Sequence, residues 1–183
     1  MQTQDDVLVK KPHQSQKWSQ EQIDELGRAM EDPIYFIEMY AYIQHPVKGR
    51  VSFDLFEYQK GLIETYNNYR YAIAMLPRQT GKSTAAAAYL LWYAMFKPDA
   101  TILIAAHKYA GAQEIMQRLR YIYETLPEWI KAGCTSYNRG SIEFDNGSRI
   151  VAQATTENTG RGMSLTLVYL DEFAFVPPRV AEE

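Results

Sequence analysis

The feature that most limits the fold of this chain is an alternation of short apolar runs with longer helical segments. The apolar runs are residues 71–76 (YAIAML), 101–106 (TILIAA) and 165–172 (LTLVYLDE). Strands that are covered on both faces read as nearly continuous apolar runs, and strands that alternate with helices form parallel sheets. We therefore expect an α/β fold in which these three runs are buried parallel strands of one sheet flanked by helices.

The segments between these runs contain helix and turn signals. Residues 83–96 consist mostly of strong helix formers and stop before Pro98, and residues 108–125 are amphipathic. Residues 141–154 differ, because they alternate on both sides of the Asn-Gly pair at 146–147, which is a strong hairpin signal. We expect this segment to form an antiparallel β-hairpin insert beside the parallel strands.

A small helical N-terminal subdomain is predicted over residues 18–57. Ser19 and Gln22 have the spacing of a capping box, and apolar residues then recur on one face of the helix that follows. Asp32 followed by Pro33 marks the start of a second helix, because aspartate caps helices and proline suits the first helical position.

The remaining N-terminal signals are shorter. Residues 1–17 are polar with mixed charge and are expected to form a mobile arm without chemistry. A turn at 45–49 and alternation over 51–55 predict a short strand, and a helix is expected at about 58–66. We expect residues 58–183 to form the core.

Composition and charge exclude several classes of protein. The 183 residues are 46% hydrophobic and 22% charged, which suits one globular domain. With 19 basic and 22 acidic side chains the net charge is −3, so nucleic acid would have to meet a local positive patch. The single Cys134 leaves too few thiolates for a disulfide framework or a structural zinc site. The longest apolar run, residues 85–96, is shorter than the roughly 20 residues that span a bilayer. We expect a cytoplasmic protein without membrane contact.

Residues 76–84 (LPRQTGKST) have the composition of a phosphate-binding loop. They lie between a predicted strand and a predicted helix, which is the context that such a loop requires. Backbone N–H groups of the loop and of the helix N-terminus bind anionic oxygens there. Gly81 lets the backbone approach a phosphate, Lys82 supplies a positive charge, and Ser83 is placed to bind a Mg²⁺ ion that bridges the β- and γ-phosphates.

The loop alone is a weak signal, because Leu76 stands where the pattern G-x-x-x-x-G-K-[ST] has its first glycine. The second signal is Asp171-Glu172 at the end of the third apolar run, which is the Walker B arrangement. In it the aspartate holds Mg²⁺ and the glutamate orients and deprotonates the attacking water. The alternative for this pair alone is a strand end with solvated or helix-capping acids. Together the two signals favour ATP hydrolysis.

Two arginines are candidates for neutralising charge in the transition state. Arg78 lies next to Gln79 inside the loop, and the alternative is that it pairs with a nearby acid. Arg161 lies between two glycines, ten residues before Asp171, and could reach the nucleotide of a neighbouring subunit. A solvated loop or a DNA contact are the open alternatives for Arg161.

Several blocks, in order along the chain, resemble the large terminase subunit of tailed phages, the ATPase that pumps DNA into the procapsid, and in particular its myovirus branch. The blocks are EYQKG at 57–61, PRQTGKST at 77–84, ILIAAHK at 102–108, LPEW at 126–129, GSIEFDNGS at 140–148, GRG at 160–162 and VYLDEFAF at 168–175. The arginine-glutamine form of the loop is a mark of this family. The resemblance implies a P-loop NTPase fold of the RecA/ASCE type.

The resemblance also implies roles for individual residues. Gln59, after Tyr58, looks like the residue that reads the adenine edge, and the His107 segment is similar to one that couples nucleotide state to movement, although we expect His107 to be a satisfied core histidine. Residues expected to bind ATP are Tyr58, Gln59, Arg78, Gln79, Thr80, Gly81, Lys82, Ser83 and Thr84. Residues expected to bind Mg²⁺ are Ser83 and Asp171. Expected catalytic residues are the base Glu172, the loop arginine Arg78, and Arg161 as an arginine finger in trans.

Partners and location follow from the same resemblance. It implies transient contact with double-stranded DNA, the portal of the procapsid, the small terminase subunit, and a homo-oligomeric ring when the chain is complete. The place would be the host cytoplasm at the portal vertex, and not the mature virion. Family members continue into a coupling motif, further strands and a nuclease domain, so this chain is expected to be truncated after Walker B. The next strand would lie between the Walker A and Walker B strands, so we expect an incomplete sheet.

Two other functions stay open. A helicase-like DNA translocase shares the same ATPase core, but it would lack the hairpin block. A nucleotide-binding fragment without catalysis, completed by another chain, is the alternative from a different class.

Overall fold

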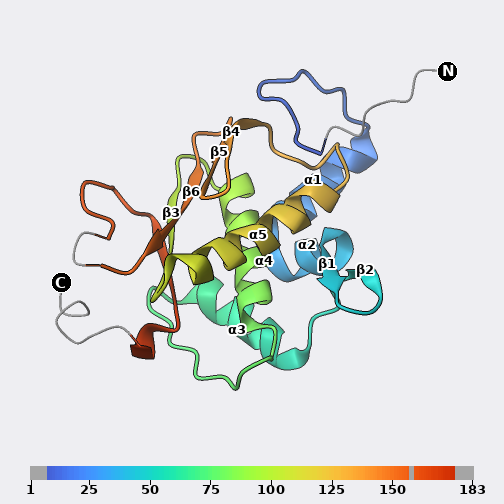
Figure 1. Ribbon diagram of the computed structural model, residues 1–183. Helices are drawn as coiled ribbons and strands as arrows, with labels where there is room; N and C mark the ends of the chain where they lie inside the picture. Colours follow the sequence, from blue (N-terminus) through green and yellow to red (C-terminus); the bar gives the residue numbers. More distant parts are fainter. Residues whose placement is uncertain (1–7, 157–158, 176–183) are drawn as a thin grey trace.

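The computed structural model describes residues 8–156 and 159–175. A five-stranded sheet is flanked by helices, and a two-stranded hairpin lies apart from it (Figure 1). The helices are α1 Gln20–Glu31, α2 Pro33–Tyr40, α3 Glu57–Asn68, α4 Lys82–Phe96 and α5 Tyr109–Thr125, with a 3₁₀ turn η1 at Phe173–Phe175. The strands are β1 Tyr42–His45, β2 Gly49–Ser52, β3 Thr101–Ala106, β4 Cys134–Tyr137, β5 Ser141–Phe144, β6 Arg149–Ala154 and β7 Leu167–Asp171. The expected α/β class is confirmed as a mixed fold.

The main sheet has the order β4-β5-β6-β3-β7. β3 pairs in parallel with both β6 and β7, whereas β4, β5 and β6 pair in antiparallel fashion. The hairpin predicted around the Asn-Gly pair is confirmed, and it lies beside the parallel strand β3, with which its strand β6 pairs in parallel. The pairing of β6 with β3 extends over six residues. Ile150 and Ala152 of β6 are buried, so one face of this strand is covered by the core, which fixes its register.

Residues 71–76, predicted as the first buried strand, form no strand. Tyr71, Ile73 and Met75 are 81%, 93% and 92% exposed. Within the described sheet β7 pairs with β3 alone, so it forms an edge, and it is only half buried where a buried strand was predicted. Both predictions were wrong for one reason: an apolar run becomes a buried strand only where neighbouring elements supply backbone partners and a covering layer.

The two N-terminal helices begin where the sequence predicts. The Ser19 hydroxyl accepts from the Gln22 amide while the Gln22 side chain accepts from the Ser19 amide, and the Asp32 carboxylate caps α2. On the expected apolar face of α1, Leu26 packs against the core, whereas Ile23 and Met30 are exposed and Ala29 is buried.

Helix α4 lies at the centre of the hydrophobic core. Ten of its residues are buried, which is typical of a helix covered on all sides. The Trp92 indole N–H donates to the carbonyl of Ala29 at 2.8 Å, and Phe36 and Ile37 of α2 belong to the same core cluster. The elements of the predicted helical subdomain therefore share their core with the sheet. No helix in the described ranges has the length and apolar character that crossing a membrane requires.

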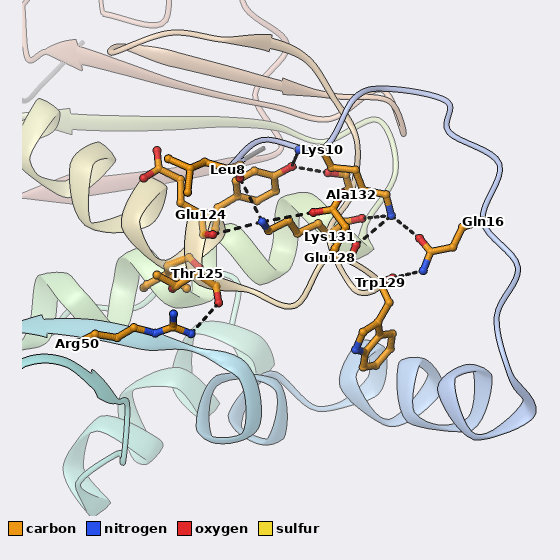
Figure 2. Close-up of polar contacts among 12 residues, drawn as sticks. Leu8, Lys10, Gln16, Arg50, Glu124, Thr125, Glu128, Trp129, Lys131 and Ala132 are labelled. Carbon is orange, nitrogen blue, oxygen red and sulfur yellow. Dashed lines mark hydrogen bonds and ion pairs between the residues drawn. The ribbon is translucent and has the colours of Figure 1, made fainter. Parts of the chain in front are cut away.

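Residues 8–17, assigned from the sequence to a mobile arm, pack against the loop that follows α5 (Figure 2). The buried Lys10 ammonium donates to the carbonyls of Glu128 and Lys131, at 3.3 and 2.9 Å, and the buried Lys131 ammonium donates to the carbonyl of Leu8 at 3.2 Å. Burial lowers the pKa of Lys10. Both ammonium groups bind mainly backbone carbonyls. Because such partners leave no trace in the sequence, the polar composition of residues 8–17 did not predict that this segment packs against the protein.

Candidate functional site

The loop before α4 leaves the N-terminus of that helix open. Gly81 occupies the N-cap position with a φ of +72°, and no side chain caps the helix there. Gln79 also has a positive φ, of +62°, which is uncommon for a residue with a side chain. A Cβ atom at Gly81 would lie 2.8 Å from Nε2 of Gln59, so glycine suits this position for both space and backbone angle. The first N–H groups of α4 can therefore face a ligand.

The structure brings Ser83 and Asp171 together, as the sequence predicts. The Ser83 hydroxyl lies 3.5 Å from Oδ2 of Asp171, although the two residues are 88 positions apart. Asp171 lies there because β7 pairs in parallel with β3, so its carboxyl end meets the edge of the sheet at which α4 begins. A hydroxyl and a carboxylate are therefore adjacent at the N-terminus of a helix.

Tyr58 and Gln59 hold the loop by its backbone. The Tyr58 hydroxyl and Nε2 of Gln59 both donate to the carbonyl of Thr80, at 2.7 and 3.1 Å. The Oε1 atom of the buried Gln59 accepts from the amide of Phe56 at 3.0 Å, so both polar groups of this side chain already have protein partners. The ring of Tyr58 stacks on that of Phe56 with centroids 5.7 Å apart, and both rings are exposed.

The side chains of Arg78, Lys82 and Glu172 make no hydrogen bond or ion pair with Ser83 or Asp171 among the described residues. Within the described residues the side chains of Arg78 and Lys82 have no hydrogen bond or ion pair, and Glu172 is exposed with a φ of +53°. Arg161 is exposed, in the described segment 159–166 that precedes β7. His107, expected to be a core histidine, is exposed instead, because β3 ends one residue earlier and the chain leaves the core there.

Two tyrosines next to Asp171 were missed by the sequence analysis. The Tyr169 hydroxyl donates to Oδ1 of Asp171 at 3.3 Å, and the Tyr66 ring lies edge-on to the Tyr169 ring. Burial, and then the negative charge of Asp171, raises the pKa of Tyr169 and raises that of Tyr66 to about 12. Both hydroxyls therefore stay protonated near neutral pH. The alternation in β7 could have shown that Tyr169 and Asp171 share a face.

A third missed residue is Arg118 of α5. Its Nη1 donates to the Thr84 hydroxyl at 3.0 Å and its Nη2 to Oε1 of Glu114 at 2.6 Å. The pair with Glu114 has the i,i+4 spacing that a sequence can show. The contact with Thr84 depends on how α5 packs against α4, which no local pattern specifies.

No group of three or more His, Cys, Asp or Glu side chains in residues 8–156 and 159–175 could hold a metal ion by itself.

Comparison with known protein families identifies a family that this chain resembles. The family model described as terminase large subunit, T4likevirus-type, N-terminal, matches residues 73–182, which is more than half of the chain. The matched segment includes the loop before α4, the Asn-Gly hairpin and Asp171.

Proposed function

This chain belongs to the T4-like family of large terminase subunits, to its N-terminal part, and from this premise we propose that it is an ATP-hydrolysing motor domain for phage DNA packaging. Family membership gives the packaging role in general terms, with DNA and the portal as general partners. Translocation of double-stranded DNA, a ring of subunits and the small terminase subunit are part of the proposal.

The observation that carries the proposal is the approach of Ser83 to Asp171. Adjacent ligands of an octahedral Mg²⁺ ion, each at 2.0–2.1 Å, are about 3 Å apart. The 3.5 Å between the Ser83 hydroxyl and the Asp171 carboxylate is close to that spacing. Mg²⁺ usually keeps waters and binds substrate phosphates beside one or two protein oxygens. The residues present therefore fit a magnesium ion that arrives with ATP.

The remaining residues supply charge and orientation in this proposal. Lys82, Thr84 and the first N–H groups of α4 bind the phosphate oxygens, and Tyr58 offers an exposed ring near the loop for the adenine. The bound Mg²⁺ would offset phosphate charge during attack by water. The carboxylate of Glu172 accepts the proton of that water. Arg78 in the same subunit, and Arg161 from a neighbouring one, stabilise the charge that develops.

Nucleotide binding without hydrolysis is a second candidate, favoured by the segment 71–76. This segment leads into the loop but lies outside the sheet, so the loop is anchored from α3 and α4 and not from a paired strand. Glu172 is exposed and its backbone has a positive φ, which is strained for a residue with a side chain. Its carboxylate would have to be reoriented by other parts of the protein to reach the attacking water.

The proposal is tested by measuring Mg²⁺-ATP binding and phosphate release with the full chain. Lys82→Ala should weaken ATP binding at least about tenfold, since it removes the positive charge nearest the phosphates. Glu172→Gln should keep binding and lower hydrolysis about 100-fold or more, because general-base catalysis contributes that much.

Lys48→Ala and Glu143→Gln are the matched controls, because both residues are exposed and lie away from the loop. If Glu172→Gln hydrolyses ATP as fast as the unmodified chain, the assigned mechanism is wrong. Binding without any phosphate release would leave the second candidate.

A further inference from the structure

The first turn of α4 is held from two directions. Ser83 points toward Asp171 on the sheet, while the next residue, Thr84, contacts Arg118 on α5. Successive residues of a helix are about 100° apart around its axis, so these two contacts fix the rotation of the turn as well as its position. Arg118 and Thr84 also line a groove of about 700 Å³ between α5 and β1, to which Arg139 contributes from the loop between β4 and β5.

The direction of the hydrogen bond determines what the Thr84 hydroxyl can still do. A guanidinium has donors and no acceptor, so the Thr84 oxygen accepts from Arg118 and keeps its own proton for another partner. A threonine hydroxyl in a helix otherwise turns to a carbonyl three or four residues earlier. Three residues earlier is the carbonyl of Gly81, which already accepts from the amides of Thr84 and Ala85, at 3.1 and 3.0 Å. The hydrogen bond from Arg118 therefore leaves the Thr84 hydroxyl proton free to point away from its own helix, where it can donate to a ligand.

Glu114 holds Arg118 in the orientation that this contact needs. It lies one turn earlier on α5 and accepts from Nη2 at 2.6 Å, while Nη1 points to Thr84. Both side chains of the ion pair are exposed, at 43% and 64%, so the pair itself contributes little to stability. Its effect is to fix the plane of the guanidinium. The charge of Arg118 is also balanced by Glu114, which makes Arg118 a poor direct phosphate ligand.

We propose that Arg118 is a positioning residue that aims the Thr84 hydroxyl at the phosphates of the bound nucleotide. This inference rests on the proposed function, since it presumes that the N-terminus of α4 binds phosphate. It adds a contact from α5 to the first turn of α4, which Ser83 also links to the sheet, while α3 holds the loop before it. Hydrogen bonds in a chain polarise one another, so the guanidinium also makes the Thr84 hydroxyl a stronger donor.

The experiment is a double-mutant cycle on Mg²⁺-ATP affinity, measured by titration of the full chain. Arg118→Gln and Thr84→Val should each raise the Kd about three- to tenfold, as expected for one partly exposed hydrogen bond to a charged group. The double variant should bind no more weakly than the weaker single variant, because both changes remove the same contact. Arg118→Lys should recover part of the loss, and Thr84→Ser should bind like the unmodified chain.

Arg139→Gln is the matched control, because this arginine lines the same groove and makes no hydrogen bond or ion pair with α4 within the described ranges. Thermal unfolding of each variant checks that the fold is kept. If the two single effects multiply in the double variant, or if Arg139→Gln weakens binding as much as Arg118→Gln, the positioning role is wrong while the proposed function stands. If the unmodified chain binds no nucleotide, both fail.

Discussion

Residues 71–76 and 101–106 are two six-residue apolar runs with opposite fates. Both precede a turn and a helix. The second run forms β3, whose Ile104 is fully buried, whereas Ile73 in the first run is 93% exposed. β3 has β6 and β7 as backbone partners on its two sides, and the first run has no strand partner among the described residues. Apolar composition thus indicates that a segment can be buried, while its neighbours decide whether it is.

The largest expected effect contrasts one isoleucine from each run. Ile104→Ala should lower the free energy of unfolding by about 2–4 kcal/mol, because it leaves a cavity in the centre of the sheet. Ile73→Ala should change it by less than about 0.5 kcal/mol, because its side chain has almost no contacts to lose. Urea unfolding of both variants is the measurement. Equal losses would mean that residues 71–76 are packed in solution, and the contrast would not hold.

A second expected effect is the pH dependence of stability that comes from a tyrosine in the buried core. Burial raises the pKa of Tyr89 in α4 to about 12, from an ordinary value of 10. Since the folded state keeps this proton longer than the unfolded state, the contribution of Tyr89 is fully present below pH 10 and is lost as the pH rises from 10 to 12. The loss should be on the order of 1–3 kcal/mol.

Tyr89→Phe removes this titration together with the hydrogen bond to the carbonyl of Tyr66. The variant should therefore be less stable near neutral pH, and its free energy of unfolding should fall less steeply between pH 10 and 12. The measurement is urea unfolding of both proteins at several pH values. Parallel curves would contradict the assignment of the raised pKa to Tyr89.

The smallest expected effect on stability comes from Ile73→Lys. This change should leave the free energy of unfolding within about 0.5 kcal/mol of the unmodified value, as for any highly exposed position. It should lower self-association, because an exposed apolar run can pair with another chain and a lysine opposes such pairing. Sedimentation at several protein concentrations measures this. Unchanged association would show that residues 71–76 are not the adhesive segment.

The helices and β3 could be predicted because several local signals coincide there. Residues 101–106 form a strand with the predicted bounds, and the capping residues Ser19 and Asp32 begin α1 and α2 as expected. The hairpin was predicted from its Asn-Gly turn, but its parallel pairing with β3 was not, since β6 meets β3 across 48 positions of sequence. Pairing between distant strands depends on the whole fold.

The residues of the candidate site also fall into two groups, those with a local sequence signal and those without one. Ser83 and Asp171 could be predicted to meet, because a loop before a helix and an acidic strand end are local signals that share one edge of a sheet. Arg118 could not be predicted to approach Thr84, because that contact depends on packing between α4 and α5. Tyr169 could have been identified, because the alternation of β7 puts it on the same face as Asp171. Sequence thus indicates the chemistry of a site better than the side chains that orient it.

The packing of Lys10 against Lys131 sets an order of events during synthesis on the ribosome. The two residues are 121 positions apart, yet Lys10 donates to the carbonyl of Lys131. At roughly 5–20 residues per second, about 6–24 s pass between the synthesis of the two residues. Lys10 therefore cannot form its native contacts until residue 131 has been synthesised. Until then the end of α5 lacks its cover, so a nascent chain halted before residue 131 keeps that helix end accessible to proteases and chaperones.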